Sequence, residues 1–275
     1  MSLKRFGALL SVVGAAMAML ALTASMASAR TPAPGYEAFA GCPSPEENPL
    51  VGACFVSTIK SGHFKMGTKK VPIEKPITWS GGWVEEGLQV KYSPKGGLTK
   101  VRQRVPGGVI GLTGLTWLTE FLGSDALTLY ATTELAGTAT APIQPPVVLP
   151  IKVHLENPIL GSKCYVGSNA NPIVLKLQTE PTNPPPPNTP ISGKDPELAE
   201  DPTRPGVVLA KNATLVDNSF AAPGANGCVL TLFGFIPISI NGLVNSQSGL
   251  PAPAGTNETV QNVDTALVET HWVYP

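Results

Sequence analysis

The first 29 residues constrain the rest of the chain most strongly, because they determine the compartment in which it folds. Two basic residues precede an almost wholly apolar run from Phe6 to Leu22, and Ala27-Ser28-Ala29 supplies the small residues of a cleavage site. This pattern predicts a secretory signal peptide over residues 1–29, cleaved between Ala29 and Arg30. An uncleaved membrane anchor is the alternative, since the apolar run approaches the roughly 20 residues of a spanning helix.

All four cysteines lie beyond this segment, and an exported chain meets an oxidising compartment. Two disulfides are therefore expected, in one of three possible pairings. We favour Cys42–Cys54 and Cys164–Cys228, because the first two cysteines lie close together in a loop-rich segment. No C-x-x-C spacing is present and the histidines lie far apart, so we expect no metal site and no cofactor.

Glycine and proline interrupt the chain too often for long helices. The 275 residues include 28 glycines and 29 prolines, while only 14% are charged. A helical bundle needs long runs free of proline, whereas short strands joined by turns suit this composition. The sequence therefore predicts a mainly β fold, an antiparallel β-sandwich-like domain with one or two short helices.

Two segments show the two-residue periodicity of strands most clearly. Residues 53–60 alternate, and we expect a turn at Ser61-Gly62 and then a short partner strand at 63–66. Between Val147 and Leu155 every second residue is apolar, which indicates one buried and one solvated face. The polar side chains on the solvated face are those of Lys152, His154 and Glu156.

The expected helices are short. Leucine spacing predicts a helix at about 112–122, with a buried loop as the alternative because Gly111 and Gly114 weaken a helix. The apolar segment 228–240 is expected to begin as a strand and to pass into a helix near 238–247. A terminal strand with a change of face, such as a bulge produces, is expected over 263–274.

A proline-rich segment at 181–205 divides the composition of the chain. We interpret it as a long surface excursion within a single domain over residues 30–275, because a Cys164–Cys228 bond would tie its two sides together. The alternative is an interdomain linker that separates one domain at 36–180 from a second at 206–275.

The charge balance gives no sign of a nucleic-acid partner. Without Lys4 and Arg5, 17 basic residues stand against 19 acidic ones, a net charge of −2. Residues 60–104 are locally basic, and we interpret them as solvated strand faces, with a surface for an anionic wall polymer as the alternative. The basic residues there are Lys60, Lys65, Lys69, Lys70, Lys75, Lys91, Lys95, Lys100, Arg102 and Arg104.

No catalytic motif is apparent, so we predict no catalytic residue. The chain has no G-x-S-x-G, H-E-x-x-H or G-x-G-x-x-G pattern. Adjacent Glu85 and Glu86 would face opposite ways in a strand and cannot act as a glycosidase pair. The histidines, His63, His154 and His271, are interpreted as exposed strand residues. The tryptophans, Trp79, Trp83, Trp117 and Trp272, are interpreted as core residues, with a sugar platform as the alternative.

Several short motifs resemble a group of uncharacterised actinobacterial exported proteins. They are Cys42-Pro43, Asn48-Pro49 and Cys54, then 62–67 (GHFKMG) and 71–73 (VPI), then 154–158 (HLENP) and 164–168 (CYVGS). The likeness covers most of the chain beyond the signal peptide. It implies an actinobacterial source and an exported location, but no activity.

The combined expectation is a secreted or cell-envelope protein that binds without catalysing a reaction. Its partner is unknown, with a cell-wall polymer or a protein as possibilities, and no membrane span is expected after signal removal. Two alternatives remain: an extracellular hydrolase of a wall glycan, which needs convergent acids near a tryptophan, and a carrier of a small apolar ligand, which needs a cavity of about 300 Å3 or more.

Overall fold

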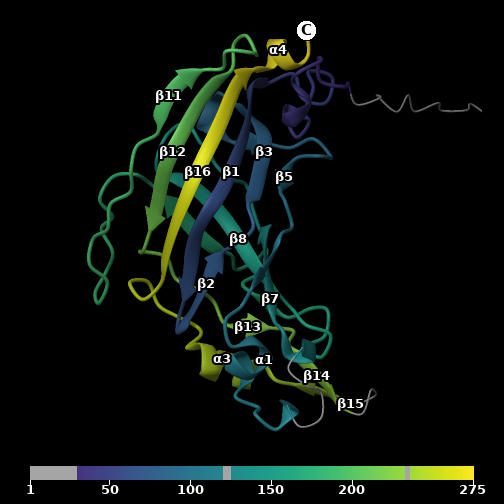
Figure 1. Cartoon of the computed structure of the whole chain (residues 1–275), viewed down its shortest axis with the longest axis vertical. Coiled ribbons are helices and arrows are strands. Elements are labelled where there is room, and N and C mark those ends of the chain that lie inside the picture. The colour runs from purple at the N-terminus through teal and green to yellow at the C-terminus, as the bar shows by residue number, and fades with distance from the viewer. Residues whose placement is uncertain (1–29, 120–124, 233–235) are drawn as a thin grey trace, which may run out of the picture.

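Two antiparallel sheets make up most of the structure (Figure 1). Side chains of both sheets belong to one core. The computed structural model describes residues 30–119, 125–232 and 236–275. The prediction of a mainly β, sandwich-like fold is confirmed. The expected signal peptide at 1–29, with Ala29 at its end, lies outside the described residues and stays a prediction.

The first sheet has eight strands in the order β11-β12-β16-β1-β3-β4, with β2 paired to β1 and β5 paired to β3. Its strands are β1 (Val51–Met66), β2 (Lys69–Ile73), β3 (Ile77–Val84), β4 (Val90–Lys91), β5 (Gly97–Leu98), β11 (Glu197–Glu200), β12 (Val208–Asp217) and β16 (Glu258–Glu269). Strands β1 and β16 pair from Ala53–Glu269 to Lys65–Glu258. The centre of this sheet thus joins segments from opposite ends of the described chain.

The second sheet has six strands in the order β13-β9-β8-β7-β6, with β10 paired to β8. Its strands are β6 (Arg102–Arg104), β7 (Tyr130–Leu135), β8 (Val147–Glu156), β9 (Tyr165–Val166), β10 (Ile173–Leu177) and β13 (Ala225–Asn226). Along β8 buried and half-buried residues alternate without exception, which confirms the predicted apolar and polar sides of this strand.

The main core lies between the sheets. Phe55 and Trp79 of the first sheet and Ile151 and Leu175 of the second belong to one cluster of buried side chains. Complete burial of such a side chain stabilises the fold by about 1.5–3 kcal/mol. A smaller cluster, at the end of the molecule that carries the C-terminus, lies on the other side of β1 (Figure 1).

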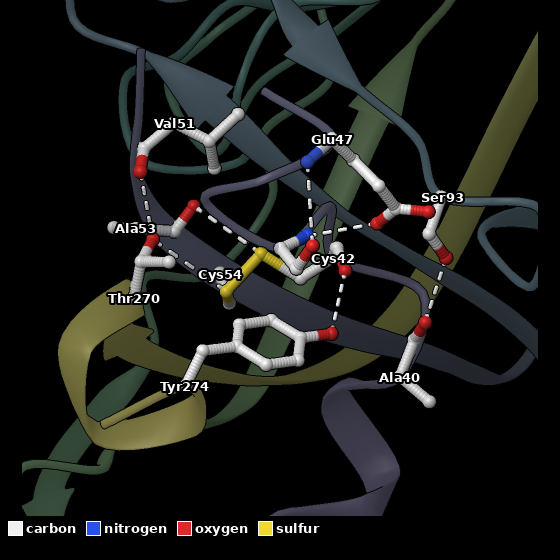
Figure 2. Close-up of a disulfide and its surroundings, with 10 residues drawn as sticks. Ala40, Cys42, Glu47, Val51, Ala53, Cys54, Ser93, Thr270 and Tyr274 are labelled. Atoms are coloured by element: carbon white, nitrogen blue, oxygen red, sulfur yellow. Dashed lines mark hydrogen bonds between the residues drawn. A yellow bond between two sulfur atoms is a disulfide. The ribbon is translucent and has the colours of Figure 1, made fainter. Parts of the chain in front are cut away.

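The first disulfide, Cys42–Cys54, lies in this smaller cluster and ties the N-terminal arm to β1. The arm contributes η1 (Glu37–Phe39), and the chain ends in α4 (Thr270–Val273). Figure 2 shows the Tyr274 hydroxyl donating to the Cys42 carbonyl at 2.8 Å and the Thr270 hydroxyl donating to the Val51 carbonyl at 2.9 Å. The two ends of the described chain are therefore fastened at one place.

The second disulfide joins Cys164, directly before β9, to Cys228, directly before the hairpin of β14 (Val229–Leu232) and β15 (Ile236–Ser239). Both disulfides match the pairing favoured from the sequence. This bond spans the proline-rich segment 181–205, and within that segment β11 pairs with β12. Part of the segment is thus a sheet strand, while the interpretation of a single domain stays a prediction.

The expected turn at Ser61-Gly62 is wrong, because β1 continues through both residues to Met66. A register shift between Ile59 and Ser61 marks a bulge instead. Gly62 has φ +135°, and a Cβ placed there would lie 2.0 Å from the Val260 carbonyl oxygen. Glycine is therefore needed here for a close approach between two strands, and this need has the same sequence signature as a turn.

The expected helix at 112–122 is also misplaced. Helix α1 (Gly108–Thr113) begins earlier and ends before Gly114, which has φ +72°. A left-handed glycine terminates a helix, so the leucine spacing across it does not continue one helix. The expected residues 120–122 lie outside the described residues. Two further short helices, η2 (Glu86–Leu88) and η3 (Asp125–Leu127), complete this half of the chain.

Near the C-terminus the boundaries differ from those expected. Strand β14 pairs with β15, and the helix that follows, α3 (Asn241–Ser248), begins only after β15. Strand β16 ends at Glu269, which pairs with Ala53 near the start of β1. Beyond this point β1 has few residues left with which β16 could pair. Residues 270–273 instead turn into α4, which buries Val273 and Tyr274 in the smaller core.

Candidate functional site

The outward side of the second sheet gathers polar and aromatic side chains from four strands. The ladder register places Arg102, Thr132, His154 and Tyr165 in one row across β6, β7, β8 and β9. Neighbouring positions add further members on the same side. We call this surface the polar face; it comprises Lys100, Arg102, Arg104, Tyr130, Thr132, Glu134, Lys152, His154, Glu156 and Tyr165.

Aromatic contacts order the polar face. The His154 and Tyr165 rings are stacked, with centroids 4.4 Å apart and planes 11° apart. The Lys152 ammonium lies 5.2 Å from the Tyr165 ring centroid, and the Arg102 guanidinium lies 4.2 Å from the Tyr130 centroid. Stacked and cation–π pairs of this kind hold the three rings and both cations in defined positions.

Two carboxylates connect the cations of the polar face. Glu156 lies 3.3 Å from Arg102 Nε and accepts a hydrogen bond from the Thr132 hydroxyl. Glu134 lies 3.1 Å from Lys100 Nζ and 3.7 Å from Lys152 Nζ. With Arg104, which has no ion pair within the described part of the chain, four cations stand against two acids. The face therefore carries an excess of positive charge.

Both shifted pKa values on the polar face preserve this charge. The Glu134 carboxylate accepts a hydrogen bond from Lys100 and raises the pKa of that ammonium, so Lys100 stays positive at neutral pH. Burial, followed by the charge of Glu134, raises the pKa of the Tyr165 hydroxyl, so Tyr165 stays neutral. At neutral pH the face thus presents cations around the uncharged Tyr165 ring.

A hollow of about 340 Å3 opens beside the row, at the end of β8. Its lining residues are Arg102, His154, Glu156, Asn157, Pro158, Gly161 and Ser162. The Asn157 amide donates to the carbonyls of Ala126 at 2.9 Å and Thr128 at 2.7 Å, which fixes the turn that forms the wall. The volume lies within the roughly 300–1,000 Å3 range of ligand sites.

One polar atom at this hollow lacks a partner. His154 Nε2 is buried and accepts or donates no hydrogen bond within the described residues. The other ring nitrogen, Nδ1, lies 3.9 Å from Glu156 Oε1, beyond hydrogen-bond distance. An unpaired buried nitrogen costs about 1–3 kcal/mol, so this histidine lowers the stability of the face to which it belongs.

The hollow does not support the hydrolase alternative. A glycosidase needs two carboxyl groups about 5–10 Å apart across the sugar. The hollow is lined by one acid, Glu156, and by no tryptophan. The backbone position of Glu134, which pairs with Lys152, is four residues along the ladder from that of Glu156, roughly 13 Å away.

The space between the two sheets does not support the carrier alternative. It is an apolar cavity of about 70 Å3, lined by side chains of both sheets such as Trp79, Leu149 and Val263. This volume is far below the roughly 300 Å3 at the lower limit of small-molecule sites.

Other residues singled out in the sequence lie apart from the polar face. The expectation of exposed strand histidines is wrong: His63 is half-buried in β1, with Nε2 2.7 Å from Glu258 Oε1, and the exposed His271 lies in α4. His154 is likewise half-buried in β8. Trp79 and Trp83 are core residues as expected. The expectation is wrong for the other two tryptophans, since Trp117 is 43% exposed and Trp272 is 39% exposed.

The sequence predicted the polar face only in part. Alternation placed Arg102, Arg104 and the polar residues of β8 on a solvated side, but Tyr130, Glu134 and Tyr165 were not connected with them. The missing information was the register between strands. The tyrosines on the two strands that flank β8 were the available signal, and they point to one face only once the pairing is known.

Two further observations concern the described residues as a whole. They contain no group of three or more histidine, cysteine, aspartate or glutamate side chains that could hold a metal ion. Among their helices, none has both the length and the apolar character that crossing a membrane requires.

No protein-family model, curated protein or solved structure matches this chain. The site is therefore defined by its geometry. The resemblance to actinobacterial exported proteins stays a prediction from sequence motifs.

Proposed function

We propose that this chain is a non-catalytic binding protein of the extracellular space or cell envelope, and that it binds through the polar face. The observation that carries the proposal is the row Arg102–Thr132–His154–Tyr165 beside a hollow of about 340 Å3. Hydrogen-bond donors, cations and aromatic rings converge there on strands, and rigid elements position binding groups more accurately than loops do.

The location outside the cytosol has two supports. The chain forms two disulfides, and such bonds persist in oxidising compartments. The first 29 residues have the charge, apolar run and small-residue cleavage pattern of a signal peptide. An actinobacterial exported protein, as the sequence motifs imply, belongs to the same proposal.

A partner in the cell envelope suits the shape of the face. A row across four strands spans about 14 Å, a length over which an extended polymer or a protein surface can make contacts. The partner is therefore a wall polymer such as a peptidoglycan or another glycan, or an envelope protein.

Co-sedimentation with insoluble cell-wall material tests the proposal. Tyr165→Ala and Arg102→Ala should each lower the bound fraction several-fold, because each removes one contact group of the row. Lys60→Ala is the matched control: it removes one half-exposed cation, paired with Asp264 at 2.8 Å, from the first sheet and should bind like the unchanged protein.

Circular dichroism and thermal unfolding of each variant establish that it is folded. Equal binding by all three folded variants would contradict the polar face as the binding surface. Release of soluble sugars from the wall material by the unchanged protein would contradict the non-catalytic assignment.

A further inference from the structure

The charges of the polar face indicate the chemistry of its ligand. We infer that the face binds an acidic polysaccharide, a sugar polymer that carries negatively charged groups. This inference rests on the proposed binding function of the same surface and adds the class of ligand.

The polar face carries more positive than negative charge. Lys100, Arg102, Arg104 and Lys152 outnumber Glu134 and Glu156, and the two acids are each already in contact with a cation. Lys100 has a side chain 70% exposed and Arg102 one 51% exposed, so both charges are accessible to a ligand. A surface with excess accessible cations selects an anion and repels a cation.

The second step concerns the group that would contact the anion. Arg102 uses Nε toward Glu156 at 3.3 Å and lies over the Tyr130 ring at 4.2 Å from its centroid. Both contacts orient its planar guanidinium, and its contact with Glu156 is made through Nε. A guanidinium held in this way matches the two oxygens of a carboxylate.

The third step concerns sugar. The Tyr165 ring, stacked on His154, is a rigid aromatic surface with a hydroxyl, and such rings pack against the apolar faces of sugars. The hollow adds the hydroxyl of Ser162 beside Glu156, so a donor and an acceptor are available to the hydroxyl groups of a sugar. Rings, hydroxyl partners and excess cations together fit a polymer that has both sugar rings and acid groups.

Binding to polygalacturonate, measured by calorimetry on the full mature chain, tests this inference. Fully methyl-esterified polygalacturonate is the matched polymer, because it keeps the sugar backbone and loses the charge. The acidic polymer should bind at least about tenfold more tightly than its ester, and this difference should shrink as salt is added. Arg102→Ala should lower affinity for the acidic polymer about tenfold, while Lys60→Ala should leave it unchanged.

The ring has its own test. Tyr165→Ala should weaken binding of the acidic polymer several-fold, whereas Tyr165→Phe, which keeps the ring, should retain most of it. Double-stranded DNA serves as a polyanion without such sugar faces in reach. Equal affinity for DNA and for polygalacturonate would contradict a sugar site and indicate a general polyanion surface.

The outcomes separate this inference from the proposed function. Equal binding of the acidic polymer and its ester, or binding of neither, would overturn the acidic ligand. The proposed function would still stand if wall material sedimented the unchanged protein and not the Tyr165→Ala variant. Loss of both results would overturn both proposals.

Discussion

The outward sides of the two sheets differ although both are solvated and both come from alternating strands. On the first sheet, Lys60 pairs with Asp264 at 2.8 Å and Lys194 pairs with Glu197 at 2.9 Å. Small polar groups fill the space between, as in the hydroxyl of Thr214 at 3.0 Å from Asn262. On the second sheet, cations exceed acids and two tyrosines are stacked with charged or polar groups.

This difference indicates that a solvated strand face becomes a binding site through the side chains that neighbouring strands contribute. In the sequence, His154 on β8 and Thr58 on β1 are both members of an alternating strand pattern. The register brings Arg102, Thr132 and Tyr165 to the level of His154, while it brings Asp264 to the level of Thr58. The side chains that share a cross-strand row therefore decide whether a solvated strand face can bind a ligand.

The largest expected effect compares the disulfides that anchor the two sheets. Replacing Cys164 and Cys228 with alanine opens a loop with a sequence separation of 64, against 12 for Cys42 and Cys54. Loop-closure entropy predicts losses of about 4 and about 3 kcal/mol. Urea unfolding of the two double variants measures both values. A greater loss for the Cys42–Cys54 pair would show that packing in the smaller core outweighs chain entropy.

The next effect is the pH dependence of stability that Tyr92 causes. Burial raises the pKa of Tyr92 from 10 to about 12, although a hydrogen bond from Trp79 Nε1 at 3.0 Å opposes the shift. The unfolded chain then loses its proton first, so stability is complete below pH 10 and falls as the pH rises toward 12, by at most about 3 kcal/mol. Tyr92→Phe should abolish this part of the fall in unfolding free energy. An identical alkaline profile in the variant would contradict it.

The third effect uses the unpartnered nitrogen of the second sheet. His154→Phe keeps a ring against Tyr165 and removes the buried Nε2, so the unfolding free energy should rise by about 1 kcal/mol. Binding to wall material should fall at the same time, because the hollow loses a polar lining residue. A variant that is less stable would show that the nitrogen has a partner in solution. Unchanged binding would remove His154 from the site.

The smallest effect is expected for the ion pair between Lys60 and Asp264 in the first sheet. Lys60 and Asp264 form a half-exposed pair, and such pairs contribute about 0.2–1 kcal/mol. A double-mutant cycle with Lys60→Ala and Asp264→Ala should give a coupling free energy in this range and no change in binding. A coupling free energy well above this range, or a loss of binding, would contradict the proposed difference between the outward sides of the two sheets.

The sequence allowed much of the fold to be predicted, for identifiable reasons. The alternation of β8 is regular because one of its sides packs against the core. The cysteine spacing and the expected export together pointed to the observed disulfides. These features depend on local pattern or on compartment, and both can be read along the chain.

The errors have one physical origin, which is that long-range pairing overrides local signals. Gly62 resembles a turn residue, yet it serves a close contact with Val260, almost 200 positions away. Residues 270–273 resemble a strand, yet β16 has no further partner there. The polar face was incomplete for the same reason, since Tyr165 joins His154 only through the pairing of β9 with β8.

The most direct test of the account maps the bound surface. Amide chemical shifts of the isotopically labelled chain, recorded as soluble wall fragments are added, report which strands the ligand touches. The account predicts perturbations concentrated on β6 to β9 and at Asn157 to Ser162, with β12 and β16 unchanged. Perturbations centred on the Lys60–Asp264 side of the first sheet would contradict it.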